Sequence, residues 1–177
     1  MTRIIAGERK GLQLRNPKGD AVRPTTDRTK EWIFSVLFDV EDARVLDLFC
    51  GAGNLGLEAL SRGASDCTFV DRAAASLKLT TRNVQIAGYA DRTTIVRADA
   101  LRFLKRPPKE FDLIFADPPY KYGDTDRLFT LVSPWLGATG RFVFESDQSY
   151  KGSLPDQLVE LRIKSLGTTT VTIYGKM

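Results

Sequence analysis

The chain has 177 residues, of which 42% are hydrophobic and 27% are charged, and this balance is typical of one globular domain with a sizeable core. No apolar run approaches the length of a membrane span. The chain contains no histidine, which excludes His-based acid–base catalysis, His-containing triads and His-ligated metal sites. We expect no metal.

Positive charge is concentrated at the start of the chain, where residues 1–30 carry eight basic and three acidic side chains. The whole chain has a formal net charge of only +4, so the remainder is nearly neutral. Two short apolar segments, residues 3–5 and 12–14, are separated by Gly7 and Gly11, and this pattern indicates a small β-hairpin. Considered alone, the pattern fits a solvated basic hairpin slightly better than a phosphate-binding arm.

A helix is predicted to follow the hairpin, beginning at Thr26 or Asp27 and running to about Val40. The apolar side chains Trp32, Ile33, Val36 and Leu37 recur at helical spacing. We expect Trp32 and Phe34 to pack in the core or against the hairpin rather than to stack on a base. The chain is thereby divided into a hairpin extension, residues 1–24, and a main domain, residues 25–177.

A buried strand is predicted over residues 44–49, and a glycine-rich turn into a helix follows it. Gly51, Gly53 and Gly56 fit the spacing G-x-G-x-x-G, which lets a ligand approach the backbone closely. Asp47 lies at the end of the strand, just before this turn. A carboxylate suits an ammonium group better than a pyrophosphate, which favours S-adenosylmethionine over a dinucleotide.

Two further predicted strands end in an acid, Asp71 and Asp99. Asp71 lies 20 residues after Gly51, where a nucleotide-binding fold places the carboxylate that binds the ribose. Asp99 can accept from an adenine amino group while the Ala100 N–H donates to the ring. Asp99 is also a candidate helix N-cap, and the two roles are compatible.

The motif Asp117-Pro118-Pro119-Tyr120 directly follows the apolar run of residues 111–116. Proline cannot continue the sheet, so the motif forms a rigid turn. The Asp117 carboxylate and the Pro118 carbonyl are acceptors, and the Tyr120 ring supplies a flat surface beside them. These groups suit the exocyclic amino group of a nucleobase, although such a motif by itself is equally compatible with a solvated turn. The polar loop 121–124 is either a lid over the base or an ordinary surface loop.

Later elements complete an α/β fold. A helix over residues 124–136, a fifth strand over 140–145 and a closing antiparallel pair over 158–163 and 168–174 are predicted. We expect Glu145, another acid at a strand end, to be structural. Cys50 and Cys67 are expected to be reduced core thiols.

The strand-end acids Asp47, Asp71, Asp99 and Asp117 are predicted to share the carboxyl edge of one parallel sheet, where open α/β sheets bind ligands. A base-binding turn at this edge makes RNA contact the favoured role of the basic hairpin. The predicted RNA contacts are Arg3, Arg9, Lys10, Arg23, Arg28 and Lys30.

The chain closely resembles a known family. The segments 47–64 (DLFCGAGNLGLEALSRGA), 70–72 (VDR) and 117–120 (DPPY) are similar to the class I S-adenosylmethionine-dependent methyltransferases, which have a Rossmann-like fold with a mostly parallel central sheet and helices on both faces. The N-terminal segments 3–7 (RIIAG) and 23–31 (RPTTDRTKE) narrow the likeness to the RsmD-type 16S ribosomal RNA guanine-N2 methyltransferases.

The resemblance covers nearly the whole chain, and it implies an S-adenosyl-L-methionine cofactor and a guanine N2 target in 16S ribosomal RNA within a small-subunit assembly particle. Asp117 is predicted to orient the target amino group, and positioning does most of the catalytic work. The predicted catalytic residues are Asp117, Pro118, Pro119 and Tyr120. The predicted cofactor-binding residues are Asp47, Phe49, Gly51, Gly53, Asp71, Arg72, Asp99, Ala100 and Asp117.

Other functions stay open at this point. Methylation of adenine N6 or of a glutamine amide would present a similar planar nitrogen to the Asp117 turn. A non-catalytic RNA-binding assembly factor would use the same hairpin but would need neither the cofactor loop nor Asp71. A nicotinamide oxidoreductase fits Asp71 but not Asp47. We expect a cytoplasmic protein, since the N-terminus has no signal-peptide pattern. A monomer is the default expectation.

Overall fold

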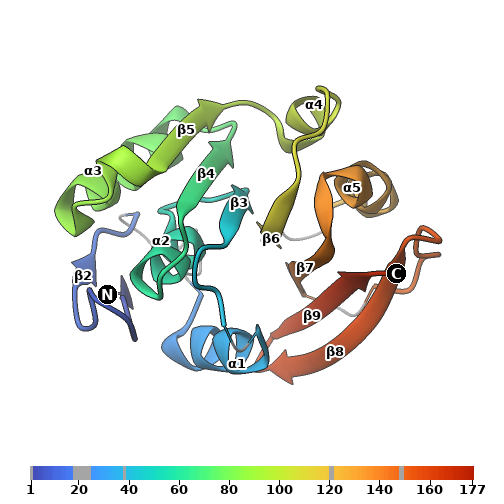
Figure 1. Ribbon diagram of the computed structural model, residues 1–177, viewed down its shortest axis with the longest axis horizontal. Coiled ribbons are helices and arrows are strands. Elements are labelled where there is room, and N and C mark those ends of the chain that lie inside the picture. Colours follow the sequence, from blue (N-terminus) through green and yellow to red (C-terminus); the bar gives the residue numbers. More distant parts are fainter. Residues whose placement is uncertain (1, 18–24, 38, 120–121, 148–149) are drawn as a thin grey trace.

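The computed structural model describes residues 2–17, 25–37, 39–119, 122–147 and 150–177. Its centre is a seven-stranded sheet with the order β5-β4-β3-β6-β7-β9-β8 (Figure 1). The strands are β3 (Arg44–Leu48), β4 (Asp66–Asp71), β5 (Thr93–Arg97), β6 (Phe111–Ala116), β7 (Leu136–Ser146), β8 (Leu158–Leu166) and β9 (Thr169–Lys176). The first five run parallel, whereas β9 is antiparallel to both β7 and β8. The predicted parallel strands and closing antiparallel pair are confirmed.

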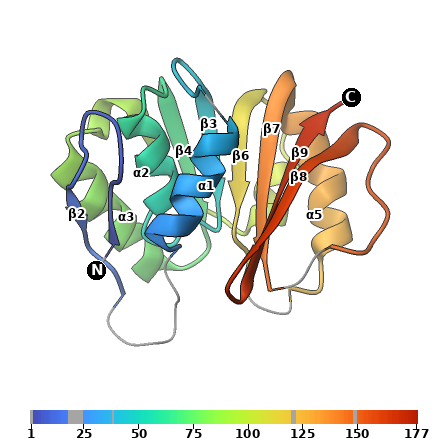
Figure 2. The same cartoon turned by 90° about the horizontal axis from the view of Figure 1, so that it is seen from below.

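Helices cover both faces of the sheet, as predicted (Figures 1 and 2). On one face, α1 (Asp27–Leu37), α2 (Asn54–Ser61) and α3 (Ala74–Ala87) pack in one hydrophobic cluster with alternate strand residues. On the other face, α4 (Ala100–Leu104) and α5 (Thr125–Val132) pack in a second cluster. Burial from both sides explains why the central strands read as nearly continuous apolar runs.

The strand order reverses at β3, and this reversal positions the site. The chain passes from β3 through α2 to β4 and through α3 to β5, and then returns to the other side of β3 as β6. A parallel sheet opens a crevice at the carboxyl ends of its strands where the order reverses, because the connections on the two sides leave in opposite directions. The ends of β3, β4 and β6 meet at this crevice.

The predicted N-terminal hairpin is confirmed, with β1 (Thr2–Arg3) antiparallel to β2 (Gln13–Leu14). It lies against the helical layer of α2 and α3 (Figure 2). Ile4 and Leu14 are buried members of the first hydrophobic cluster, so the hairpin contributes to the core of the main domain. The predicted division of the chain into a hairpin extension, residues 1–24, and a main domain, residues 25–177, stays a prediction.

The bounds of several predicted elements differ from those in the structure. The first helix, expected to run to about Val40, ends at Leu37, and the strand expected over 158–163 extends to Leu166. The helix expected over 124–136 ends at Val132 and continues as the 3-10 turn Ser133–Trp135, because Pro134 cannot donate in a helix. The strand expected over 140–145 begins already at Leu136. Cys50 and Cys67 are free and buried, as predicted. Among the described residues, no helix is long and apolar enough to span a bilayer.

Candidate active site

A cavity of about 400 Å³ lies at the carboxyl ends of β3, β4 and β6. It adjoins a smaller pocket of about 80 Å³, and Phe49, Asp71, Arg72 and Pro119 line both. The structure thus brings together most of the predicted site. Asp47, Gly51 and Asp117 line the larger cavity, and Asp99 and Ala100 line the smaller one.

The glycine-rich turn has a shape that only glycine adopts easily. Gly51 and Gly53 have φ angles of 55° and 80°, in the left-handed region. The Gly51 N–H donates to Asp71 Oδ2 at 3.0 Å, and Thr80 Oγ1 donates to the Gly51 carbonyl at 2.8 Å. The helix and strand behind the turn therefore hold it in place while its outer face borders the cavity.

Asp47 is an almost completely buried acid beneath the turn, with 3% of its surface exposed. Its Oδ2 accepts from the Gly56 N–H at 3.0 Å, at the start of α2. Burial raises the pKa of Asp47 to about 7; the Gly56 N–H opposes this, and the charges of Asp117 and Asp71 reinforce it. A nearby cation would favour the ionised form. The predicted contact with an ammonium group therefore suits the environment of Asp47.

Asp71 and Asp99 both bind backbone N–H groups. Asp71 Oδ1 accepts from Ala73 at 2.8 Å in addition to the Gly51 contact, and each carboxylate oxygen retains a second lone pair. The contact of Asp71 with a ribose stays a prediction. Asp99 Oδ1 accepts from Arg102 N at 3.1 Å and caps α4, which confirms the predicted N-cap. Its contact with adenine stays a prediction.

Aromatic side chains form one wall of the smaller pocket. Phe49 adopts a left-handed φ of 57°, which is rare for a residue with a side chain, and its ring meets Tyr122 edge to face at 5.3 Å between centroids. Tyr122 lines the pocket with Asp99. The sequence indicated Tyr122 only as part of the loop 121–124, a lid or a surface loop, and not as a residue that lines a pocket with Asp99.

Asp117 follows β6, where its side chain is exposed to the large cavity. The protein that surrounds it on the other sides desolvates the carboxylate and raises the pKa of Asp117. Pro118 is buried, whereas Pro119 is exposed and borders both cavities. Tyr120 and the loop residue Lys121 lie outside the described residues, and the predicted base stacking stays a prediction.

The predicted RNA contacts have different environments. Arg3, Arg9, Lys10 and Arg28 are exposed, and Arg3 Nε pairs with Asp27 Oδ2 at 2.9 Å. Arg23 lies outside the described residues. Lys30 departs from the prediction because its side chain is completely buried.

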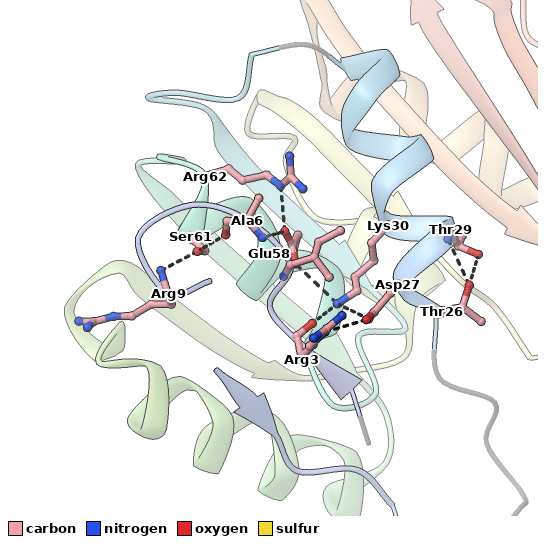
Figure 3. A network of polar contacts seen from close by, with 11 residues as sticks. Arg3, Ala6, Arg9, Thr26, Asp27, Thr29, Lys30, Glu58, Ser61 and Arg62 are labelled. Carbon is pink, nitrogen blue, oxygen red and sulfur yellow. Dashed lines mark hydrogen bonds and ion pairs between the residues drawn. The ribbon is translucent and has the colours of Figure 1, made fainter. Parts of the chain in front are cut away.

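The buried Lys30 is the centre of a polar network that fastens the hairpin (Figure 3). Its ammonium group donates to the Arg3 carbonyl and lies 3.5 Å from Glu58 Oε2, on a carboxylate that is also fully buried. Glu58 accepts in turn from the Ile5 and Ala6 N–H groups at 2.9 and 3.1 Å. Lys30 is therefore removed from the RNA-binding set, and its role is to anchor α1 and the hairpin on α2.

Residues just after the hairpin close one side of the cavity, and sequence patterns missed them. Asn16, Pro17 and Thr25 line it together with the glycine-rich turn. Asn83 on α3 connects the two parts, because its Nδ2 donates to the carbonyls of Arg15 and Ala52, both at 2.9 Å. The partners in the first of these bonds are 68 residues apart, so no local pattern could indicate the contact.

The order reversal at β3, the glycine-rich turn and the acid-lined cavity are those of a class I methyltransferase. The model of the family described as "Conserved hypothetical protein 95" matches residues 2–175. The chain belongs to this family.

Similar proteins agree with this assignment. The Bacillus subtilis protein YlbH is 39% identical over 183 residues, which cover 98% of each chain. "Ribosomal RNA small subunit methyltransferase D" of Escherichia coli is 36% identical over 82% of this chain and 74% of its own length. The solved structure of the Escherichia coli protein yhhF has a TM-score of 0.90 and 31% identity, covering 99% of this chain and 97% of that one. The resemblance to RsmD-type methyltransferases is confirmed.

Proposed function

We propose that this protein transfers a methyl group from S-adenosylmethionine to the exocyclic N2 amino group of a guanine in 16S ribosomal RNA. One observation carries the proposal: Asp117, the acceptor for a base amino group, lines the same cavity as the glycine-rich turn and Asp71. Cofactor and target would therefore meet in one space. The printed name of the Escherichia coli relative, a small-subunit ribosomal RNA methyltransferase, supports the choice of RNA.

The residues present fit the cofactor. The cavity volume of about 400 Å³ lies within the usual range for small-molecule sites. We assign Asp47 to the ammonium group, Asp71 to the ribose, and Asp99 with the Ala100 N–H to adenine. Gly51 lines the larger cavity and gives access to the backbone, whereas Gly53 lines neither cavity and shapes the turn. Phe49 and Arg72 border both the larger cavity and the smaller pocket.

When bound, S-adenosylmethionine supplies an electrophilic methyl group that moves to nitrogen as the carbon–sulfur bond breaks, the sulfur keeps the electron pair and the nitrogen then loses a proton. The protein supplies position and polarity. Asp117 and the Pro118 carbonyl would accept from the N2 amino group and direct its lone pair toward the cofactor. Tyr120 would stack on an unpaired or flipped guanine.

We assign RNA phosphate binding to the exposed Arg3, Arg9, Lys10 and Arg28, together with Arg23. Phosphate contacts position a nucleic acid without reading its sequence, whereas the Asp117 turn reads the base. A small-subunit assembly particle as substrate, a monomeric enzyme and a cytoplasmic location complete the proposal.

The test is methyl transfer from labelled S-adenosylmethionine to small ribosomal subunits and RNA from cells that lack this protein, followed by nucleoside analysis. We expect the label in N2-methylguanine. Label in N6-methyladenine would retain the site but overturn the target base. Cofactor binding without label in any RNA or subunit would overturn an RNA substrate and direct attention to protein amides or a non-catalytic role.

A further inference from the structure

A second acid, Glu145, lies beside Asp117 at the carboxyl edge of the sheet. Ala116 of β6 pairs with Phe144 of β7 in parallel register, so the next residues along each strand, Asp117 and Glu145, are neighbours. Glu145 is only 3% exposed. Its Oε1 atom has no hydrogen-bond partner among the residues that the structure describes. Because an ionised carboxylate in such a place is costly, Glu145 requires either a proton or a partner.

Glu145 and Asp117 line a small pocket of about 30 Å³. The other lining residues are hydroxyl-bearing or apolar: Thr25, Thr26, Thr29, Leu166 and Thr169. No lysine or arginine among the described residues lines this pocket. Thr25 and Asp117 also border the large cavity, so the pocket and the proposed active site share a wall. A pocket of this volume holds about one water molecule.

The surroundings of Glu145 favour its neutral form. Burial raises the pKa of Glu145 well above its ordinary value, the negative charges of Asp117 and Asp47 raise it further, and the Thr25 hydroxyl opposes them. Two adjacent carboxyl groups resist simultaneous ionisation. Asp117 is open to the large cavity whereas Glu145 is enclosed, so the negative charge belongs on Asp117 and the proton on Glu145.

We propose that Glu145 is a positioning residue for methyl transfer, which keeps a proton and donates it to Asp117 through one water molecule in their shared pocket. This inference rests on the proposed function, and it deepens the role of Asp117. The donated hydrogen bond engages one Asp117 oxygen and leaves the other, ionised, for the target amino group. The proton that leaves the methylated nitrogen passes to Asp117 and from there to solvent through the cavity.

The first test needs no RNA: titration of the Asp117 carboxyl by carbon-13 NMR in the free protein and in two variants. Glu145→Gln retains a donor but cannot ionise, and Glu145→Leu removes the donor while filling similar space. We expect the pKa of Asp117 to stay near the wild-type value in E145Q. In E145L we expect this pKa to rise, with a roughly tenfold change in proton affinity, because the anion loses its donor.

The sign of the shift decides the outcome. If Glu145 were ionised in the wild type, both variants would remove a negative charge and lower the pKa of Asp117, which would overturn the proposal. Unchanged titration in both variants would also overturn it and leave Glu145 structural. Glu160→Gln, at an exposed acid of β8, is the matched control. Glu145→Met replaces E145L if the leucine variant does not fold.

Turnover is the second readout. E145Q is expected to keep kcat within about threefold of wild type, and E145L to lose roughly tenfold or more at neutral pH. Cofactor Kd should change little in either variant, since Glu145 does not line the large cavity. Equal loss of turnover in E145Q and E145L would contradict a donor role. If the wild-type protein methylates no RNA, the proposed function fails. The NMR titration would still test whether Glu145 keeps a proton and donates it toward Asp117.

Discussion

At the scale of single residues, the site combines acids whose environments differ. Asp71 and Asp99 are tied to backbone N–H groups, whereas Asp47 is buried with one such donor and Asp117 faces the cavity. Backbone donors stabilise a carboxylate, and burial destabilises it. Asp71 and Asp99 are thus suited to accept from neutral hydroxyl and amino groups. Asp47 is suited to a cation, and Asp117 to a group that becomes positive during reaction.

Asp117→Ala should lower turnover by about 100-fold or more, because it removes the acceptor that orients the amino group and stabilises its developing charge. Asp117 is also a predicted cofactor contact, but the contacts that we assign to the cofactor come from other residues, so cofactor Kd should stay within about threefold. Single-turnover methyl transfer and calorimetric cofactor binding measure the two quantities. Asp156→Ala, at an exposed acid remote from the cavity, is the control. Near-wild-type turnover in D117A would remove Asp117 from the mechanism.

Asp47 should make stability depend on pH. Its pKa is about 7 in the folded protein against an ordinary 3.8, so the folded state binds the proton more tightly than the unfolded state. The free energy of unfolding of the cofactor-free protein should therefore fall as pH rises from about 4 to 7, by an amount on the order of 2–4 kcal/mol from this residue.

The matching variant is Asp47→Asn, whose amide oxygen can still accept from Gly56. Urea unfolding should show that D47N gains stability over wild type at pH 8 but not at pH 4. Its cofactor affinity should fall, because the cation loses its counter-charge. Equal stability differences at the two pH values would show that Asp47 is ionised in the folded protein without penalty.

At the scale of elements, α2 joins the cofactor site to the hairpin. Its first turn presents Gly56 N–H to Asp47, and its buried Glu58 binds the hairpin backbone and Lys30. Burial lowers the pKa of Lys30, while the charges of Glu58 and Asp27 raise it. Removing one partner of a buried ion pair leaves the other uncompensated, which is more harmful than losing an exposed pair.

Glu58→Ala should therefore lower the free energy of unfolding by about 3–5 kcal/mol, since it removes the acceptor of two hairpin N–H groups and leaves the buried Lys30 ammonium group with only the partly exposed Asp27 carboxylate, 3.7 Å away, as a counter-charge. Denaturant titration measures the loss. Glu160→Ala on β8 should change stability by no more than about 0.5 kcal/mol. A loss that small in E58A would mean that the hairpin is not held by this carboxylate.

At the scale of the whole molecule, the basic hairpin and the cavity of the proposed active site occupy adjoining regions. The basic hairpin lies against α2 and α3, and the residues that follow it border the cavity. An RNA bound along the hairpin would thus have a short path for one base to reach Asp117. The anchoring of Arg15 and Ala52 by the same Asn83 side chain keeps these regions in fixed relation.

The salt dependence of RNA binding should report on the hairpin. Replacing Lys10 and Arg28 by Gln should reduce the slope of log K against log salt by about 0.7–0.9 for each phosphate group that the protein no longer neutralises. Lys109→Gln, an exposed change just before β6 and so at the opposite edge of the sheet, should leave the slope unchanged. Equal slopes in the wild type and in all of these variants would show that Lys10 and Arg28 do not bind RNA phosphates.

The sequence by itself determined the parallel strands, the glycine-rich turn and the row of strand-end acids. These features follow local rules: apolar runs form buried strands, glycines permit left-handed turns, and parallel strands bring their carboxyl ends to one edge. Only the tertiary structure decided that Lys30 is buried against Glu58, that Asn16 and Thr25 close the cavity, and that Glu145 stands beside Asp117. These contacts join residues far apart in the chain, and the environment of each side chain is set by packing that no local pattern encodes.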